Sequence, residues 1–333
     1  MRKQLFVFVA LLIAVSSQQS AVSKEDVLIE NNTQAAPKEL PVTDNRQPIA
    51  IFDAQRAFAI LEKQCEFGPR PPGSIAHRQT QSYLFAELQK YANNVELQPC
   101  QYEVDGVTLR LNNILAEFGP KAEAIPSVTG VEPIGETLLL AAHWDTRPIA
   151  DRDPNPENQH KPILGANDGA SGVAVLLEIA RVLSLHPPPR RIVIVLFDGE
   201  DYGRSVDDMF IGSRFFAQNL GKWRPDYGIL LDMVGDKDLS LPIERYSWEA
   251  NREFTQAIWD RASTLGLAPF QQRLGAAILD DHVPLIKVGI PMVNIIDFTY
   301  PYWHTVEDTV DKCSAKSLEV VATLVISIIY DGL

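Results

Sequence analysis

The sequence predicts an α/β fold in which one central β-sheet is covered by helices on both faces. Short segments that are apolar at nearly every position alternate along the chain with longer segments of helical apolar spacing. A strand that is apolar on both sides is typical of a sheet with helices on each face. Polar residues collect directly after several of these strands, where ligands bind in such sheets.

The first half of the chain predicts two helices followed by three strands. Asp53 stands at the start of a helix over 53–67, and Ser74 caps a second helix that ends near Tyr91. Residues 95–104 and 107–118 alternate as strands do, with a hairpin turn at Asp105 and Gly106. Residues 136–145 form a third strand, apolar on both faces.

The second half alternates helices and strands to the end of the chain. Pro187–Pro189 close a helix over 168–185, and a helix over 212–220 follows the strand 190–198. The remaining elements are a strand at 226–235, a helix at 247–266, a strand at 290–298 and a helix at 314–333. The strand 190–198 runs into Glu200 and Asp201. Neighbouring side chains of an extended chain point to opposite faces, so we expect these two acids to do different work.

The amino terminus predicts export. Residues 1–23 carry two basic residues, an apolar run and then small residues, as secretory signal peptides do. The alternative is a membrane anchor, but the run Leu5–Val15 is too short to span ~30 Å of hydrocarbon. Residues 24–47 are polar and aperiodic, typical of a disordered linker, and 48–333 then form a single catalytic domain. We expect a periplasmic or secreted protein without stable membrane insertion after signal cleavage.

Charge and cysteine content exclude several classes of function. A net charge of −13 argues against nucleic acid or an anionic membrane as a partner. Three cysteines are an odd number, so no complete disulfide framework exists. Cys65 and Cys100 could pair in an oxidising compartment or remain separate buried thiols. No Cys-x-x-Cys spacing occurs, so a metal site must use histidines and carboxylates.

Three motifs near strand ends suggest metal chemistry. In "HWD", Asp145 stands two residues after His143, where a carboxylate can orient a histidine ligand; a His–Asp pair in a loop is the alternative. In "NDGASG", Asp168 is surrounded by small residues that leave room for a ligand site, although it could be a helix N-cap. In "FDGED", one acid would bind a metal and the other would act as general base; otherwise this is a solvated acidic loop.

Three further residues extend the pattern. Asp232 ends an apolar strand and needs hydrogen bonds or a charge partner, which backbone N–H groups could also supply. Asp281 precedes a short amphipathic stretch, where it could be an N-cap, and His304 follows Trp303, against which it could simply pack. Two imidazoles and three carboxylates without thiolate suit catalytic zinc, the candidate ligands being His143, Asp168, Asp201, Asp232 and His304.

The motifs "HWD", "NDGASG", "FDGED", "LLDMVG", "DDHVPL" and "WHT" occur in an order that resembles the zinc aminopeptidase superfamily, which also contains the animal glutaminyl-peptide cyclotransferases. The resemblance runs from about Gln55 to Leu333 and implies a central mixed, twisted β-sheet with helices on both faces. In the co-catalytic aminopeptidases it implies two zinc ions bridged by Asp168, one completed by His143 and Asp232 and the other by Asp201 and His304.

In the cyclotransferases the resemblance implies one zinc ion, held by Asp168, Asp201 and His304. Glu200, Asp232 and Asp281 would then form an acidic proton relay, and Trp303 would pack against the substrate glutamine. Asp281 and Trp303 match the cyclotransferase branch. Asp201 stands where that branch usually has Glu, and residues 202–210 lack its tryptophan.

We therefore expect a zinc-dependent cyclotransferase that converts the N-terminal glutamine of peptides or proteins to pyroglutamate with loss of ammonia, acting as a monomer. The alternative is a di-zinc aminopeptidase in which Glu200 activates water. A zinc or peptide-binding domain without catalysis would have lost this base, and Glu200 is present.

Overall fold

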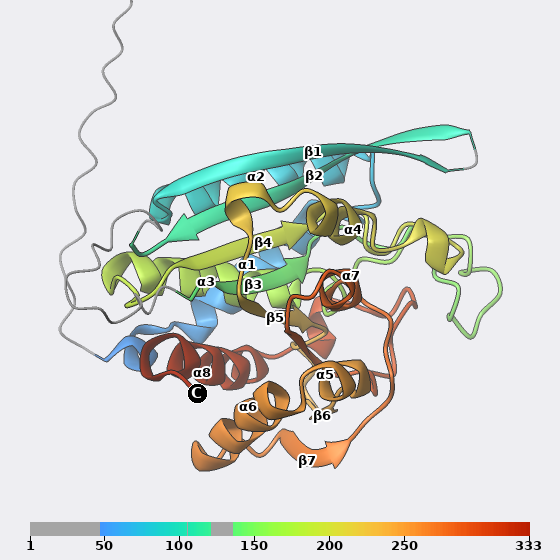
Figure 1. Cartoon of the computed structure of the whole chain (residues 1–333). Coiled ribbons are helices and arrows are strands. Elements are labelled where there is room, and N and C mark those ends of the chain that lie inside the picture. Colours follow the sequence, from blue (N-terminus) through green and yellow to red (C-terminus); the bar gives the residue numbers. More distant parts are fainter. Residues whose placement is uncertain (1–46, 105, 121–135) are drawn as a thin grey trace, which may run out of the picture. The chain divides into compact units, whose positions relative to one another are not determined.

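A six-stranded mixed β-sheet forms the centre of the domain (Figure 1). The computed structural model describes residues 47–104, 106–120 and 136–333. In spatial order the strands are β1 (Asn94–Val104), β2 (Val107–Phe118), β4 (Ile192–Phe197), β3 (Leu138–His143), β5 (Tyr227–Asp232) and β8 (Met292–Ile296). The last four run parallel, whereas β2 is antiparallel to both of its neighbours. The α/β class and the mixed sheet are confirmed.

Helices cover both faces of this sheet. One face packs against α1 (Ala54–Glu66), α2 (Ile75–Tyr91), α3 (Ser171–Leu185) and α8 (Ala315–Asp331), and the other against α4 (Ile211–Gln218) and α7 (His282–Lys287). Strand β3 illustrates the division, because Leu138 and Leu140 belong to the first layer and Leu139 and Ala141 to the second. The doubly apolar strands read from the sequence are therefore buried on both sides.

The predicted caps form, since Asp53 accepts the backbone N–H groups of Gln55 and Arg56, and Ser74 accepts that of His77. The prediction of a single helix over 247–266 is wrong. It divides at Asn251 into α5 (Arg245–Ala250) and α6 (Arg252–Thr264), because Asn251 leaves the helical region with φ of −149° and ψ of 68°. A two-stranded sheet of β6 (Leu241–Ile243) and β7 (Phe270–Leu274) flanks these helices, and four short 3-10 turns complete the elements: η1 (Pro48–Ile51), η2 (Val206–Asp208), η3 (Gly221–Trp223) and η4 (Val310–Lys312).

The end of β4 differs from the expectation of an extended chain. The strand stops at Phe197, and residues 198–201 form bends in which Gly199 has a φ of +74°. A side chain at that backbone conformation would be strained, so glycine suits the position. Glu200 and Asp201 therefore point in different directions because of this turn, not because of strand alternation.

The sequence also gave rise to predictions about the cysteines and the amino terminus. Cys65, Cys100 and Cys313 are buried free thiols, so the pairing considered for Cys65 and Cys100 does not occur. The predicted signal peptide and almost all of the predicted linker lie outside the described residues. Within the described ranges no helix is long and apolar enough to cross a bilayer.

One buried carboxylate connects three segments beside the carboxyl edge of the sheet. Glu244 caps α5 by accepting the N–H groups of Tyr246 and Ser247, and it also accepts the N–H of Ile278. Its Oε2 lies 3.1 Å from Nε2 of His282 in α7. Burial alone would raise the pKa of Glu244, but the hydrogen bond and charge of His282 and the backbone donors lower it to about 2.

We predict that Glu244→Gln lowers the free energy of unfolding by ~1–3 kcal/mol at pH 7, because a charge-assisted hub is lost. The folded-state pKa lies below the unfolded value of about 4.3, so the ionised Glu244 stabilises the fold above pH ~4.3 and loses this effect as pH falls toward 2. Urea unfolding of both proteins from pH 7 to pH 3 should show the difference shrinking. A constant difference across this range would contradict the assignment.

Candidate metal centre

Five predicted ligands converge at the carboxyl edge of the parallel strands. His143 ends β3 and Asp232 ends β5, whereas Asp201 follows the turn after β4. Asp168 stands in the turn before α3, and His304 lies in the segment after β8. Parallel strands bring their carboxyl ends to one edge, which is why residues far apart in sequence meet here. All five side chains are buried.

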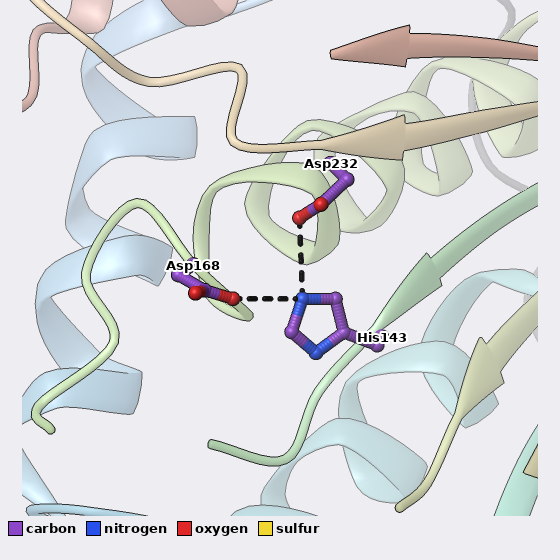
Figure 2. A group of neighbouring side chains, drawn as sticks. All are labelled: His143, Asp168 and Asp232. Atoms are coloured by element: carbon purple, nitrogen blue, oxygen red, sulfur yellow. Dashed lines mark hydrogen bonds and ion pairs between the residues drawn. The ribbon is translucent and has the colours of Figure 1, made fainter. Parts of the chain in front are cut away.

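These residues form two triads that share Asp168. In the first, Nε2 of His143 lies 3.2 Å from Oδ1 of Asp168 and 3.2 Å from Oδ1 of Asp232 (Figure 2). In the second, Nε2 of His304 lies 3.2 Å from Oδ1 of Asp201 and 3.7 Å from Oδ2 of Asp168. Asp168 thus turns one oxygen toward each histidine.

The spacing fits metal ligands. In a tetrahedral site with metal–ligand bonds of about 2.0–2.1 Å, neighbouring ligand atoms lie about 3.3–3.4 Å apart. Oδ2 of Asp168 and Oδ2 of Asp201 are buried and have no hydrogen-bond partner among the described residues. Buried oxygens without a partner are rare, and beside two imidazoles such oxygens fit the ligands of a cation. Carboxylate and imidazole donors without thiolate agree with zinc.

The histidine pKa values lead to the same conclusion. Burial would lower the pKa of His143, but interactions with Asp145, Asp168 and Asp232 outweigh it and raise this pKa well above its ordinary value. At His304 burial again lowers the pKa. The charge of Asp201 and the hydrogen bonds to Asp151 and Asp201 outweigh this effect and raise the pKa to about 9. The carboxylates therefore favour a positive charge at each triad. Either a proton on the histidine or a metal ion can supply it.

Asp145 orders the turn that carries the acidic pair. Its two carboxylate oxygens accept the N–H of Glu200 at 3.1 Å and that of Asp201 at 3.3 Å. Oδ1 also lies 3.7 Å from Nδ1 of His143, near the ring but beyond hydrogen-bond distance. Gly169 allows this close packing, because a Cβ there would come within 2.4 Å of the Asp145 carbonyl oxygen and 3.3 Å of the His143 ring.

Arg147 and Asp151 connect two of the three ligands of the second triad, Asp201 and His304. Nη1 of Arg147 donates to Oδ1 of Asp201 at 2.9 Å, and the rest of the guanidinium binds both oxygens of Asp151 at 2.8 and 3.0 Å. Oδ1 of Asp151 lies 3.2 Å from Nδ1 of His304. No motif in the sequence indicated this chain of contacts, although Arg147 stands only two residues after Asp145.

Asp308 holds the turn that carries the shared ligand. Its carboxylate accepts the N–H of Asn167 at 2.9 Å, the N–H of Asp168 at 3.1 Å and the hydroxyl of Tyr300 at 2.8 Å. The ligand segment after β8 is therefore bonded to the ligand turn before α3. His304 itself has a φ of 56°, an unusual backbone conformation for a residue with a side chain and one that occurs at functional sites.

A cavity of about 380 Å³ opens over the two triads. Its wall combines charged and apolar side chains. The acids are Asp151, Asp168, Glu200, Asp232 and Asp280, the basic residues are Arg147, Arg152 and Arg204, and the apolar residues include Phe210, Met233, Ile278, Ile296, Phe298 and Trp303. The Trp303 ring stacks on His304 with centroids 4.0 Å apart. A larger hollow of about 810 Å³ near the C-terminus contains none of the predicted site residues.

The structure brings Asp280, rather than the predicted Asp281, to this cavity. Asp281 is fully buried and does not line the wall. Asp280 accepts the amide N–H of Asn294 and carries a pKa of about 7, raised by burial and then by the charge of Asp232. Sequence alone could not separate two adjacent aspartates, since either one can face the cavity depending on how α7 begins.

Other acids that follow strands have structural roles. Asp198 lies 2.7 Å from Nε2 of His77 and accepts the N–H of Asn112. Asp297 accepts the N–H groups of Ser240 and Thr299. Their position after apolar strands resembles that of the ligands, but their oxygens are used by protein donors.

The model of peptidase family M28 matches residues 123–329. Among curated proteins, the chain is 27% identical to aminopeptidase YwaD of Bacillus subtilis over 59% of this chain and only 41% of that protein. It is 26% identical to the glutaminyl-peptide cyclotransferase of Drosophila melanogaster over 77% of this chain and 76% of that protein.

Solved structures resemble this domain more fully. A Tannerella forsythia glutaminyl cyclase is 35% identical with a TM-score of 0.77, covering 84% of this chain and 99% of that one. A Zn-dependent exopeptidase from Parabacteroides distasonis is 35% identical with a TM-score of 0.76, covering 84% of this chain and 98% of that one. Both kinds of protein therefore have this fold.

We predict that Arg147→Gln weakens metal binding by about 10–100-fold, the usual effect of losing a group that orients ligands. The substitution removes the contacts that hold Asp201 and Asp151. Zinc competition against a chromogenic chelator would measure the change. Arg152→Gln is the matched control, because Arg152 also lines the cavity and its side chain lies over the Trp303 ring. Equal zinc affinity in the two variants would refute the role of Arg147.

Proposed function

We propose that this chain, which belongs to peptidase family M28, is a zinc-dependent glutaminyl-peptide cyclotransferase that acts on the N-termini of peptides or proteins. The observation that carries the proposal is the cavity beside the second triad. Its volume of about 380 Å³ is near the lower limit of ligand sites, which suits a single residue, and Trp303 forms part of its wall. A glutamine side chain is neutral and flat, so it fits between an indole ring and a row of carboxyl groups.

Asp168, Asp201 and His304 would hold the zinc ion. When bound, zinc supplies Lewis acidity toward the oxygen of the side-chain amide. The buried acids beside this triad attract the N-terminal ammonium of the peptide, because opposite charges are favoured where water is excluded. The α-nitrogen then stands close to the amide carbon within the same residue, and ring closure needs no water molecule.

Glu200 would transfer the proton. Burial and then the charge of Asp201 raise the pKa of Glu200 well above its ordinary value, and the opposing effect of the His143 charge is smaller. A carboxyl group poised in this way can accept a proton from the α-amine and donate it to the departing nitrogen. The new bond joins the α-nitrogen to the side-chain carbonyl carbon, the old amide bond breaks, and ammonia leaves.

Asp232 and Asp280 would complete the proton-sharing group. Burial raises the pKa of Asp232, and the charge of Asp232 is in turn the largest charge effect on the pKa of Asp280. Two carboxyl groups so placed favour sharing one proton. We propose that Asp280 has the role in the proton relay that the family resemblance implied for Asp281.

A di-zinc aminopeptidase is the second candidate, and one observation favours it. The ligand atoms of the first triad, His143, Asp168 and Asp232, lie within the same range of distances as those of the second, so the site has donors for two ions. Glu200 would then take a proton from water and hydrolyse the first peptide bond. The relatives include enzymes of both kinds, so each of the two reactions has support from them.

Export and oligomeric state remain part of the proposal. We propose that residues 1–23 direct export and that the mature enzyme is a periplasmic or secreted monomer, acting on peptide N-termini and on neither nucleic acid nor membranes. The basis is the sequence pattern of the amino terminus and the net charge of −13.

The two reactions are separated by their products. With peptides Gln-Ala-Phe-amide and Leu-Ala-Phe-amide, we expect ammonia and an intact pyroglutamyl peptide from the first and no free leucine from the second. Zinc measured on the same sample should be about one per chain. Glu200→Gln should reduce turnover at least ~100-fold while zinc is retained, because the base is removed and the ligands remain. Release of leucine with two zinc ions per chain would establish the aminopeptidase instead.

The assignment of Asp280 has its own test. Asp280→Asn should lower kcat about 10–1,000-fold with zinc content unchanged, since the residue lines the cavity without belonging to either triad. Asp281→Asn removes a neighbouring carboxyl group that does not line the cavity, and we expect a much smaller loss of kcat in the protein that folds. Circular dichroism and zinc content would verify folding of both variants. A greater loss for Asp281→Asn would return the role to that residue.

A further inference from the structure

A second cavity of about 270 Å³ lies between α4 and α7 on the surface of the domain. These two helices contact each other beside the sheet (Figure 1). The cavity has an apolar floor, formed in part by Ala217 and Pro284, and neither of the two zinc-ligand triads reaches it.

This cavity adjoins the catalytic cavity across a shared wall. Four residues line both, one from η2, one just before α4 and two just before α7: Val206, Phe210, Leu279 and Asp280. Val206 and Leu279 are large apolar side chains that are 53% and 44% exposed. Exposed apolar residues at the junction of two cavities favour a ligand that extends from one into the other.

The second cavity contains two basic side chains near its rim. Lys287 and Arg214 line it together with Asp207 and Asp280. Lys287 is exposed and forms no ion pair or hydrogen bond with the described residues. Arg214 donates to the backbone oxygen of Asp207 and lies over the Tyr102 ring, so no described carboxylate neutralises it.

We infer that the groove between α4 and α7 binds the second and third residues of the substrate peptide and favours a carboxylate there. The inference rests on the proposed function, because it takes the N-terminal residue to occupy the catalytic cavity. An extended peptide advances about 3.3–3.6 Å per residue, so the residues after the first reach beyond the shared wall within two or three positions. An acidic side chain would then meet Lys287, while the N-terminal ammonium faces Glu200 and Asp232.

The test compares peptides that differ in one charge. Gln-Ala-Glu-Ala-amide and Gln-Glu-Ala-Ala-amide are compared with the same peptides carrying Lys in place of Glu, all amidated so that no terminal carboxylate interferes. At low salt we expect kcat/KM for ammonia release to be about 3–10-fold higher for at least one Glu peptide, the size of one or two exposed ion pairs. The preference should shrink as sodium chloride is added.

Lys287→Glu should abolish or invert this preference, and Lys287→Gln should reduce it. Lys316→Glu is the matched control, because it changes the net charge equally on α8, where its side chain is 77% exposed and lines neither cavity. The control should keep the wild-type preference. If Lys287→Glu keeps it too, the carboxylate is held elsewhere, for example by Arg152 or Arg204 at the catalytic cavity, and the inference is overturned.

Binding distinguishes this inference from the proposed function. Fluorescently labelled versions of the same peptides are titrated into Glu200→Gln, alone and combined with Lys287→Glu. A Glu preference in binding that Lys287→Glu removes supports the groove even if the wild-type enzyme releases no ammonia, in which case only the cyclotransferase proposal fails. Ammonia release with equal kcat/KM for Glu and Lys peptides overturns the groove and leaves the proposed function standing.

Discussion

The domain is organised around a cluster of buried carboxylates that needs positive charge. Asp168, Asp201, Asp232 and Glu200 are each at most 9% exposed, and they lie around two imidazoles at one edge of the sheet. Ionised groups away from water are costly unless they are paired or bind a metal ion. In the described structure the imidazoles contribute part of the charge, and two carboxylate oxygens still lack a partner. A metal ion satisfies this requirement more completely than protons do, because it accepts several oxygens at once.

The ligands are positioned by residues that do not themselves bind metal. Asp145 orders the acidic turn, Arg147 joins it to Asp151, and Asp308 holds the turn of Asp168. The Asp145–Glu200, Arg147–Asp201 and Asp308–Asp168 contacts each join segments that are 50 or more residues apart. Such outer contacts fix the geometry of a site before the ligand arrives. The shared position of Asp168 makes the two triads mechanically dependent, so a change in one turn affects both.

The charges around the two cavities suggest how a peptide is oriented. The inner cavity has more carboxylates than arginines in its wall, and the groove between α4 and α7 contains Lys287 and Arg214 beside Asp207 and Asp280. A peptide has a positive amino terminus, and an acidic residue further along gives it the complementary pattern. Orientation by opposite charges acts over distances comparable to the Debye length of ~10 Å at 0.1 M salt, so it can align the substrate before close contact.

Local patterns in the sequence were sufficient for the sheet class, the helix caps at Asp53 and Ser74, and the five candidate ligands, because burial periodicity, capping and strand-end polarity act over a few residues. The break at Asn251 was missed because apolar spacing continues through it, and tertiary packing of α5 and α6 decides where the helix divides. The choice between Asp280 and Asp281 depends on the direction in which α7 begins, and Glu244, from another part of the chain, contacts both Ile278 and His282 there. The Arg147–Asp201 contact, the free state of Cys65 and Cys100, and the groove between α4 and α7 likewise depend on segments brought together only by the fold. Local sequence patterns identify which residues could bind a metal or act in catalysis. The packing of distant segments determines which of these residues share a site.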